Sequence, residues 1–296
     1  MPPQARRIYI AAVNTQLIMK IVRFETQRLL RSPAGAVFLA FYFILFTWLM
    51  MQLHAIGEKL SDKVGTALDA TGDQGRKVVS DAIGWVVEVE GSQILELVSE
   101  HPPLLLLFFA LVLGFTPVAA LLASVDQTAS DIGSRHLRFV LLRVDRKTLY
   151  VGKTIAAWVF YSAALAIVCV MALGVTLSVG GDVGEAFLYT VRIWLTGVLY
   201  ALPFVCFAGF ASALTGHAAL AALMVILYTF IVWAISSVGA WMSDGAGMIG
   251  LLMPTHWKYS LLADDMTVVL KPVVHSIVFG VLVFALGMRT FRRRDI

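Results

Sequence analysis

The first features to search for in this 296-residue sequence are side chains that could bind a nucleotide or a metal, or act as a nucleophile. The phosphate-binding loop G-x-x-x-x-G-K-[ST] is represented only by its last residues, Gly152-Lys153-Thr154, with Lys147 where the first glycine belongs. The six histidines never stand in pairs at metal-ligand spacing, and no G-x-S-x-G nucleophile motif occurs. We therefore predict that the chain is not an enzyme and holds no cofactor or metal of its own.

Composition indicates where such a chain resides. Hydrophobic residues make up 59% of the sequence and charged residues only 14%, with a mean hydropathy of +0.83. A soluble domain is nearer 45–50% apolar and about 25% charged. The two cysteines, Cys169 and Cys206, lie within long uncharged stretches, where they are expected to pack as small apolar side chains. The composition predicts an all-α integral membrane protein.

Uncharged stretches locate the predicted spans, because a helix needs about 20 apolar residues to cross a bilayer. Residues 34–53, 103–125 and 154–181 carry no charge. The 51 residues of 193–243 also carry none and would form a single helix of about 76 Å, so the chain must fold back at Thr215-Gly216-His217. This gives spans at 193–214 and 218–237, and a sixth at 272–288 with Pro272 in its first turn.

The distribution of basic residues predicts the orientation, because Lys and Arg accumulate in cytoplasmic segments. Sixteen of the 23 Lys and Arg residues fall in 1–33, 126–153 and 289–296, together with five acidic residues. The intervening segments hold seven basic and 14 acidic residues. We expect a multi-pass protein of the cytoplasmic (inner) membrane with both termini in the cytoplasm. The basic excess then reflects orientation, and nucleic acid is not expected as a partner.

Polar groups within the spans are few. No carboxylate occurs there, which disfavours a proton path or an intramembrane enzyme, and Asp264 and Asp265 are adjacent in an outer segment and point in different directions. The remaining polar side chains are predicted to form hydrogen bonds between helices: Thr116, Ser162, Thr196, Ser212, Tyr228 and Ser236.

Two segments are predicted to lie outside the cytoplasm. The acidic insertion 54–101 has apolar residues at helical spacing, which predicts two or three short amphipathic helices that form either a solvated linker or a cap for a substrate or partner. The segment 239–271 contains an uncharged part, 245–257, that is too short to cross. It is either re-entrant or interfacial, with Trp241 and Trp257 as anchors.

Residues 1–33 are predicted to form a cytoplasmic N-terminus with an interfacial amphipathic helix, followed by a single transmembrane domain, 34–296. The helix has its cations and its apolar residues on different faces, although Glu25 falls on the apolar side. Ser32-Pro33 then turns the chain into the first span. The expected interfacial cations are Lys20, Arg23, Arg28 and Arg31.

The loop 126–153 combines six basic residues with the apolar run 137–142, interrupted only by Arg138. A solvated loop would not need that run. An amphipathic basic helix beneath the membrane explains both features, and it would either lie on lipid headgroups or dock a soluble partner.

At this loop the chain resembles the transmembrane subunits of type-2 ABC exporters. These subunits have a basic entry helix ending in a Ser-Pro-like turn, an insertion after the first of six spans, and a loop after the second. That loop carries an acidic residue, a leucine run, an arginine and a Gly-Lys step. Here residues 28–33 match the entry turn, and the loop matches at Asp131, 137–143, Arg146 and Gly152-Lys153. Gly133-Ser134-Arg135-His136 replaces the usual Glu-Gly-Thr step, and Val144 replaces the usual proline.

The resemblance implies a permease subunit, an exporter, that pairs with a second copy of itself or a related permease. A separate cytoplasmic ATP-binding cassette subunit would supply the ATP and Mg²⁺ chemistry and dock on the second cytoplasmic loop. The residues expected to form that docking surface are Asp131, Arg135, Arg138, Phe139 and Arg143. The alternative is a non-transporting membrane scaffold or assembly factor that holds a soluble partner or anionic lipid through the same loop.

Overall fold

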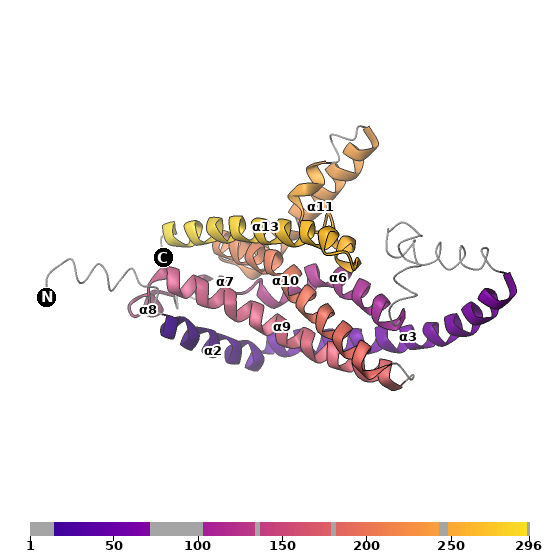
Figure 1. Cartoon of the computed structure of the whole chain (residues 1–296). Helices are drawn as coiled ribbons and strands as arrows, with labels where there is room; N and C mark the ends of the chain where they lie inside the picture. The colour runs from indigo at the N-terminus through magenta and orange to yellow at the C-terminus, as the bar shows by residue number, and fades with distance from the viewer. Residues whose placement is uncertain (1–14, 72–102, 134–136, 179–181, 243–247, 295–296) are drawn as a thin grey trace.

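The computed structural model describes residues 15–71, 103–133, 137–178, 182–242 and 248–294, and in these ranges the regular structure is helical (Figure 1). Six of the described helices are long and apolar enough to cross a membrane. The protein is an all-α, multi-pass membrane protein, as the composition predicts. Its long helices are α3 (Pro33–Thr71), α6 (Pro103–Ser124), α9 (Arg146–Ser178), α10 (Val183–Thr215), α11 (Ala218–Met242) and α13 (Met266–Arg293).

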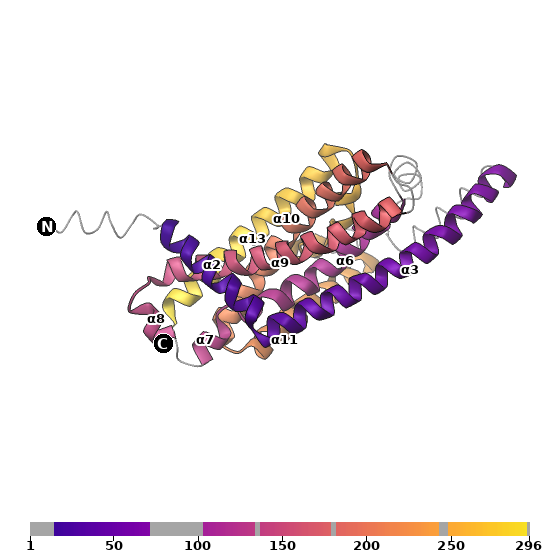
Figure 2. The same cartoon turned by 90° about the horizontal axis from the view of Figure 1, so that it is seen from below.

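Shorter elements gather at one end of this bundle. They are α2 (Thr15–Arg31), α7 (Ala129–Gly133) and α8 (Leu137–Leu141), and the last turn of α13 lies beside them (Figure 1). We call this end the basic end. Figure 2 shows α2 crossing α9, against which it packs.

The main core lies between α3, α6, α9 and α10. On α3 the buried residues Phe38, Tyr42, Phe46 and Met50 recur every fourth position and form one stripe. The other side of α3 is apolar as well as exposed, for example at Phe41 and Trp48. Exposed apolar faces of this kind suit a helix surrounded by lipid, where burial in protein is not needed to remove them from water.

Polar side chains join the helices across this core, as predicted. The hydroxyls of Thr116 on α6 and Tyr161 on α9 lie 2.8 Å apart. On α10, Ser212 accepts a hydrogen bond of 3.1 Å from the N–H of Thr128. The interhelical role predicted for Thr116 is thus confirmed, whereas Ser212 bonds to Thr128 in the turn between α6 and α7.

The corner between α2 and α3 is made by one side chain. Ser32 donates from its hydroxyl to the Leu29 carbonyl (2.9 Å) and accepts from the N–H of Gly35 (2.9 Å). It therefore satisfies the last turn of α2 and the first turn of α3 together. Pro33 follows at the first position of α3, where its missing N–H has no helical partner to lose.

Several helices extend beyond the predicted spans, because charged residues were taken to end them. α3 continues through the first part of the 54–101 insertion to Thr71, and residues 72–101 of that insertion lie outside the described ranges. α10 begins ten residues before 193, at Val183, where Asp182 caps its N-terminus. α13 begins at Met266 with Asp265 as its cap, so Pro272 lies inside the helix and not in its first turn.

The loop 126–153 does not form the single amphipathic helix predicted for it. It contains the two short helices α7 and α8, and its last residues, from Arg146, already belong to α9.

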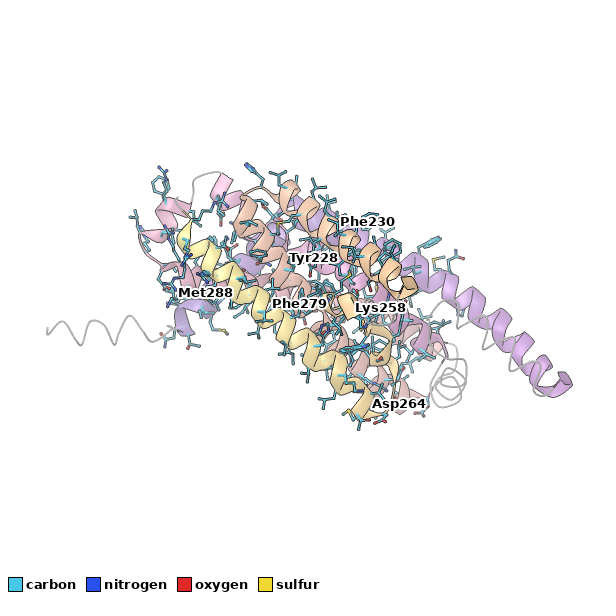
Figure 3. All side chains as sticks on the ribbon, turned by 90° about the horizontal axis from the view of Figure 1, so that it is seen from above. Tyr228, Phe230, Lys258, Asp264, Phe279 and Met288 are labelled. Carbon is cyan, nitrogen blue, oxygen red and sulfur yellow. The ribbon has the colours of Figure 1, made fainter. Side chains whose placement is uncertain are left out.

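In the segment 239–271, residues 239–242 belong to α11, 266–271 belong to α13, and 243–247 lie outside the described residues. The part between, 248–265, is irregular and packs on the bundle. It contains the 3₁₀ turns η1 (Met248–Leu252) and η2 (Lys258–Leu262). The carbonyl of Leu252 accepts a hydrogen bond of 2.7 Å from the Tyr228 hydroxyl of α11, and the Leu251 carbonyl lies 2.7 Å from Nε2 of His275 on α13. Tyr228 faces this segment and packs on Phe207, whereas Phe230 of the same helix is exposed (Figure 3). Two free carbonyls of irregular backbone are thus satisfied by the flanking helices.

Two arginines tie helix ends together at the basic end. Arg294 donates to the carbonyls of Ala213 (2.5 Å) and Leu214 (2.9 Å), which end α10. Arg146 donates to the carbonyls of Arg292 and Arg294, both at 2.8 Å. Cations at helix C-termini satisfy unpaired carbonyls and oppose the negative end of the helix dipole. Between α10 and α11, Gly216 adopts φ 72°, as the predicted turn requires.

We expect Gly216→Ala to destabilise the fold, because an L side chain is strained at this positive φ and a Cβ there would contact the Arg294 guanidinium. The expected loss is about 1–2 kcal/mol, measured by SDS unfolding of the detergent-solubilised protein in mixed micelles. Gly114→Ala and Gly174→Ala are matched controls, because no neighbouring atom lies within 4 Å of their Cβ positions. A Gly216→Ala variant as stable as these controls would contradict the strain.

Candidate functional site

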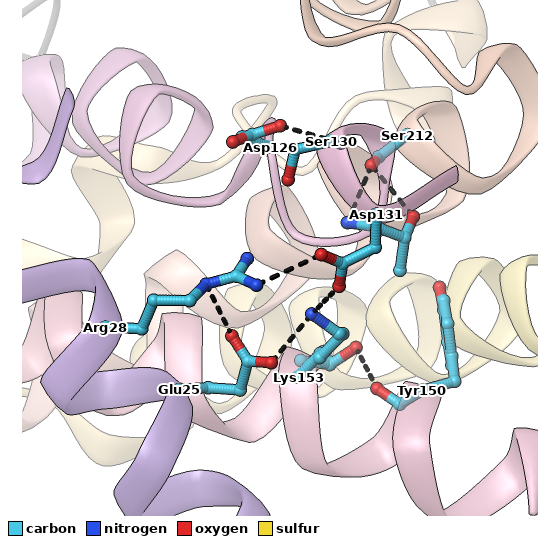
Figure 4. A network of polar contacts seen from close by, with 10 residues as sticks. Glu25, Arg28, Asp126, Ser130, Asp131, Tyr150, Lys153 and Ser212 are labelled. Carbon is cyan, nitrogen blue, oxygen red and sulfur yellow. Dashed lines mark hydrogen bonds and ion pairs between the residues drawn. The ribbon is translucent and has the colours of Figure 1, made fainter. Parts of the chain in front are cut away.

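Four charged side chains form a closed ring of ion pairs at the basic end (Figure 4). Arg28 Nε lies 3.2 Å from Glu25 Oε2, and Arg28 Nη1 lies 3.0 Å from Asp131 Oδ1. Lys153 Nζ lies 2.8 Å from Glu25 Oε1 and 2.5 Å from Asp131 Oδ2. We call these four residues the charge cluster. It links α2, α7 and α9, and its formal charge is zero.

The charge cluster is largely removed from solvent. The Lys153 side chain is only 2% exposed, the two carboxylates are 8–10% exposed, and Arg28 at the edge is 35% exposed. Burial alone would lower the pKa of the Arg28 guanidinium, but the charges of Glu25 and Asp131 more than offset this effect and raise it. Desolvated charges are costly without their partners, so the ion pairs must form together.

Local sequence brings these groups together. Glu25 and Arg28 lie three residues apart and share one face of α2. A Cβ on Gly152 would lie 2.6 Å from Cγ2 of Ile21, so glycine at this position allows α2 to approach α9 closely. The Gly152-Lys153 step thus supplies both the close approach of the two helices and the central cation of the charge cluster.

The start of the loop is anchored to α10, which holds Asp131 in place. Gln127 donates to the Val205 carbonyl (3.2 Å) and accepts from the Thr154 hydroxyl (3.3 Å). Thr128, the next residue, bonds to Ser212 through both its N–H and its hydroxyl. These contacts fix the turn from which α7 begins.

The far end of the loop is fixed by a helix cap. The carboxylate of Asp145 accepts a hydrogen bond of 3.0 Å from the N–H of Thr148 at the start of α9. Burial would raise the pKa of Asp145, but the bonds from Thr148 outweigh it and lower that pKa. The carboxylate is therefore ionised at neutral pH, as the positive end of the helix dipole favours.

Between these anchors, α8 and the two residues after it expose a basic and apolar surface. Leu137 is fully buried against Leu149, Tyr150 and Phe291. Phe139 is 71% exposed and Leu142 is 83% exposed. Arg138 and Arg143 are also exposed. We call Arg138, Phe139, Leu142 and Arg143 the α8 surface.

The structure divides the predicted docking residues into two groups. Arg138, Phe139 and Arg143 lie on the α8 surface. Asp131 is buried in the charge cluster, so its carboxylate supports the loop from inside and is not available to a partner. Arg135 lies outside the described residues.

The predicted interfacial cations divide in the same way. Lys20, Arg23 and Arg31 are exposed on the outer side of α2. Arg28 points inward to the charge cluster.

Sequence reasoning missed the roles of Glu25 and Lys153. Glu25 was noticed only as an acid on the apolar side of α2, and Lys153 was counted among the loop cations. A carboxylate that is buried on a packed helix face needs a compensating partner such as a cation. The position of Glu25 on the apolar side of its helix could therefore have predicted an ion pair. It would not have selected Lys153 from the several cations nearby.

Among the described residues, no group of three or more His, Cys, Asp or Glu side chains could hold a metal ion. The ion pairs of the charge cluster connect α2, α7 and α9. Comparison with known proteins adds no relative, because no family model and no curated protein matches the sequence.

We expect Lys153→Met to destabilise the protein by about 3–5 kcal/mol, because it leaves Glu25 and Asp131 buried without their shared cation. Unfolding in SDS mixed micelles measures the loss. Lys147→Met, on an exposed position of the same helix, should change stability by less than about 0.5 kcal/mol.

The double variant Glu25→Gln/Lys153→Met should recover part of the stability lost in the single variant, because it leaves the neutral Arg28–Asp131 ion pair in place of an uncompensated carboxylate. Equal stability of Lys153→Met and the wild type would show that the charge cluster does not hold the three elements together.

Proposed function

We propose that the chain is the permease subunit of a type-2 ABC transporter, an exporter of the cytoplasmic membrane that works with a separate cytoplasmic ATP-binding cassette subunit. The observation that carries this proposal is the α8 surface, an exposed arginine and aromatic patch on a loop with rigid anchors. Arginine and aromatic side chains are enriched among the residues that dominate protein–protein binding energy.

The anchoring of the loop supports a role in transmitting motion. A partner bound to α8 would pull on a segment that is tied to α10 by Thr128, to α9 by Asp145 and to α2 by the charge cluster. Movement of α8 would therefore be passed directly to two long apolar helices. A surface that served only to hold a partner would not need these connections.

The proposed arrangement places both termini and the α8 surface in the cytoplasm, where the basic residues accumulate. Two permeases, either two copies of this chain or one copy with a related chain, would enclose the transport path. ATP and Mg²⁺ would be bound by the cassette subunits.

The proposal predicts that a cassette ATPase co-purifies with the tagged protein from its native membrane in mild detergent, at a ratio near 1:1. Mass spectrometry of the recovered soluble subunits makes the measurement. Repeated recovery of intact protein with a different soluble partner, and no ATPase, would instead favour the scaffold function.

Arg138→Ala/Phe139→Ala should reduce recovery of the ATPase at least tenfold, because it removes two exposed contacts worth about 1 kcal/mol or more each. It should also uncouple ATPase activity from transport in reconstituted vesicles. Leu286→Ala/Arg289→Ala removes an exposed apolar and an exposed basic residue from α13 and serves as the matched control. Unchanged coupling in the Arg138/Phe139 variant would remove the α8 surface from the docking site.

A further inference from the structure

The outer face of α2 carries positive charge only. The helix contains a single acidic residue, Glu25, and that residue points into the charge cluster. Three cations remain exposed: Lys20, Arg23 and Arg31. Exposed apolar side chains stand beside them, with Met19 and Phe24 each 65% exposed. This face therefore combines cations with apolar surface and lacks any carboxylate to neutralise it.

A pocket of about 220 Å³ opens beside this face, between α2 and the loop. Its apolar walls are Ile21 and Phe24 of α2 with Val140, Val144 and Leu149 of the facing segment. The charge cluster lines the rest, and its four charges neutralise one another. Lys20 also lines the pocket and, among the described residues, has no carboxylate within ion-pair distance.

We propose that this pocket and the adjoining cations bind one anionic phospholipid. Lys20 and Arg23 hold the phosphate, and the pocket takes the apolar part of the molecule nearest the headgroup. The match is one of charge and polarity: a single negative charge meets the cations that α2 leaves unpaired, and methylene groups meet the five apolar side chains.

The position of the site favours a lipid as the occupant. α2 crosses α9 near the end of the long apolar helices (Figure 2), and in a protein that spans a bilayer the headgroups lie at the ends of such helices. The lipid would lie between α2 and α8 and reinforce their contact. The inference does not depend on the ATPase, since it concerns α2 and the inner side of the loop and not the α8 surface.

The test uses the full-length protein in mild detergent, with dioleoylphosphatidylglycerol and dioleoylphosphatidylcholine added in equal amounts, and native mass spectrometry to count bound lipids. The wild type should retain phosphatidylglycerol selectively. Lys20→Gln/Arg23→Gln should weaken this binding about 25-fold, since each cation near a lipid surface contributes about fivefold. Val144→Trp, which fills the pocket and leaves every charge in place, should also weaken it.

Arg289→Gln/Arg292→Gln removes two exposed cations from α13 at the same end and is the matched control, with an expected change of less than twofold. An equal loss in this control would overturn the proposal in favour of diffuse charge attraction. Unchanged selectivity in Lys20→Gln/Arg23→Gln would overturn it directly. Complete displacement of the lipid by inorganic phosphate would show an anion site without a lipid component, and would overturn it as well.

Discussion

The ammonium group of Lys153 lies between two carboxylates in a site that water scarcely reaches, and the arrangement of the basic end depends on it. Glu25 comes from α2 and Asp131 from α7, so the same cation holds a helix that precedes the first span and a helix that follows the second. Each carboxylate would be strongly disfavoured in this environment alone. The geometry also requires Gly152, because a larger residue would hold α2 away from α9 and separate Glu25 from Lys153.

The charge cluster works together with a second set of contacts at helix ends. Arg294 satisfies the last carbonyls of α10, and Arg146 satisfies those of α13. Both arginines belong to segments that a hydropathy analysis treats as solvated flanks. Here their guanidinium groups replace water as donors, so the ends of α9, α10 and α13 are fixed relative to one another. The central position of α10, which packs against α6, α9, α11 and α13, extends this order through the bundle.

The long apolar helices could be predicted from the sequence, but most of the contacts at the basic end could not. The absence of charge over 20 or more residues is a property of the chain alone, and it located the first five long apolar helices and the turn at Gly216; the sixth was located by a shorter uncharged run, 272–288. The ends of α9 and α10 could not be found in this way, because Lys153 and Arg192 lie within helices and are neutralised by residues distant in sequence, Glu25 and Asp264. The prediction for the loop 126–153 was wrong for a related reason. Its apolar run suggested one amphipathic helix, but contacts with residues distant in sequence, such as Thr128 with Ser212 and Asp131 with Lys153, hold the loop as the short helices α7 and α8.

The contacts of α2 limit how a partner bound at α8 could move the loop. The loop cannot move away from α2 without separating Asp131 from Arg28 and exposing or stranding buried charge, which costs several kcal/mol. α2 in turn leads directly into α3 through the Ser32 corner, whose hydrogen bonds join the two helices. A displacement of α8 small enough to preserve the ion pairs must therefore carry α2 and the start of α9 with it, and α3 follows α2. The elements at the basic end are thus expected to move as one body, with adjustment in the long apolar helices beyond it.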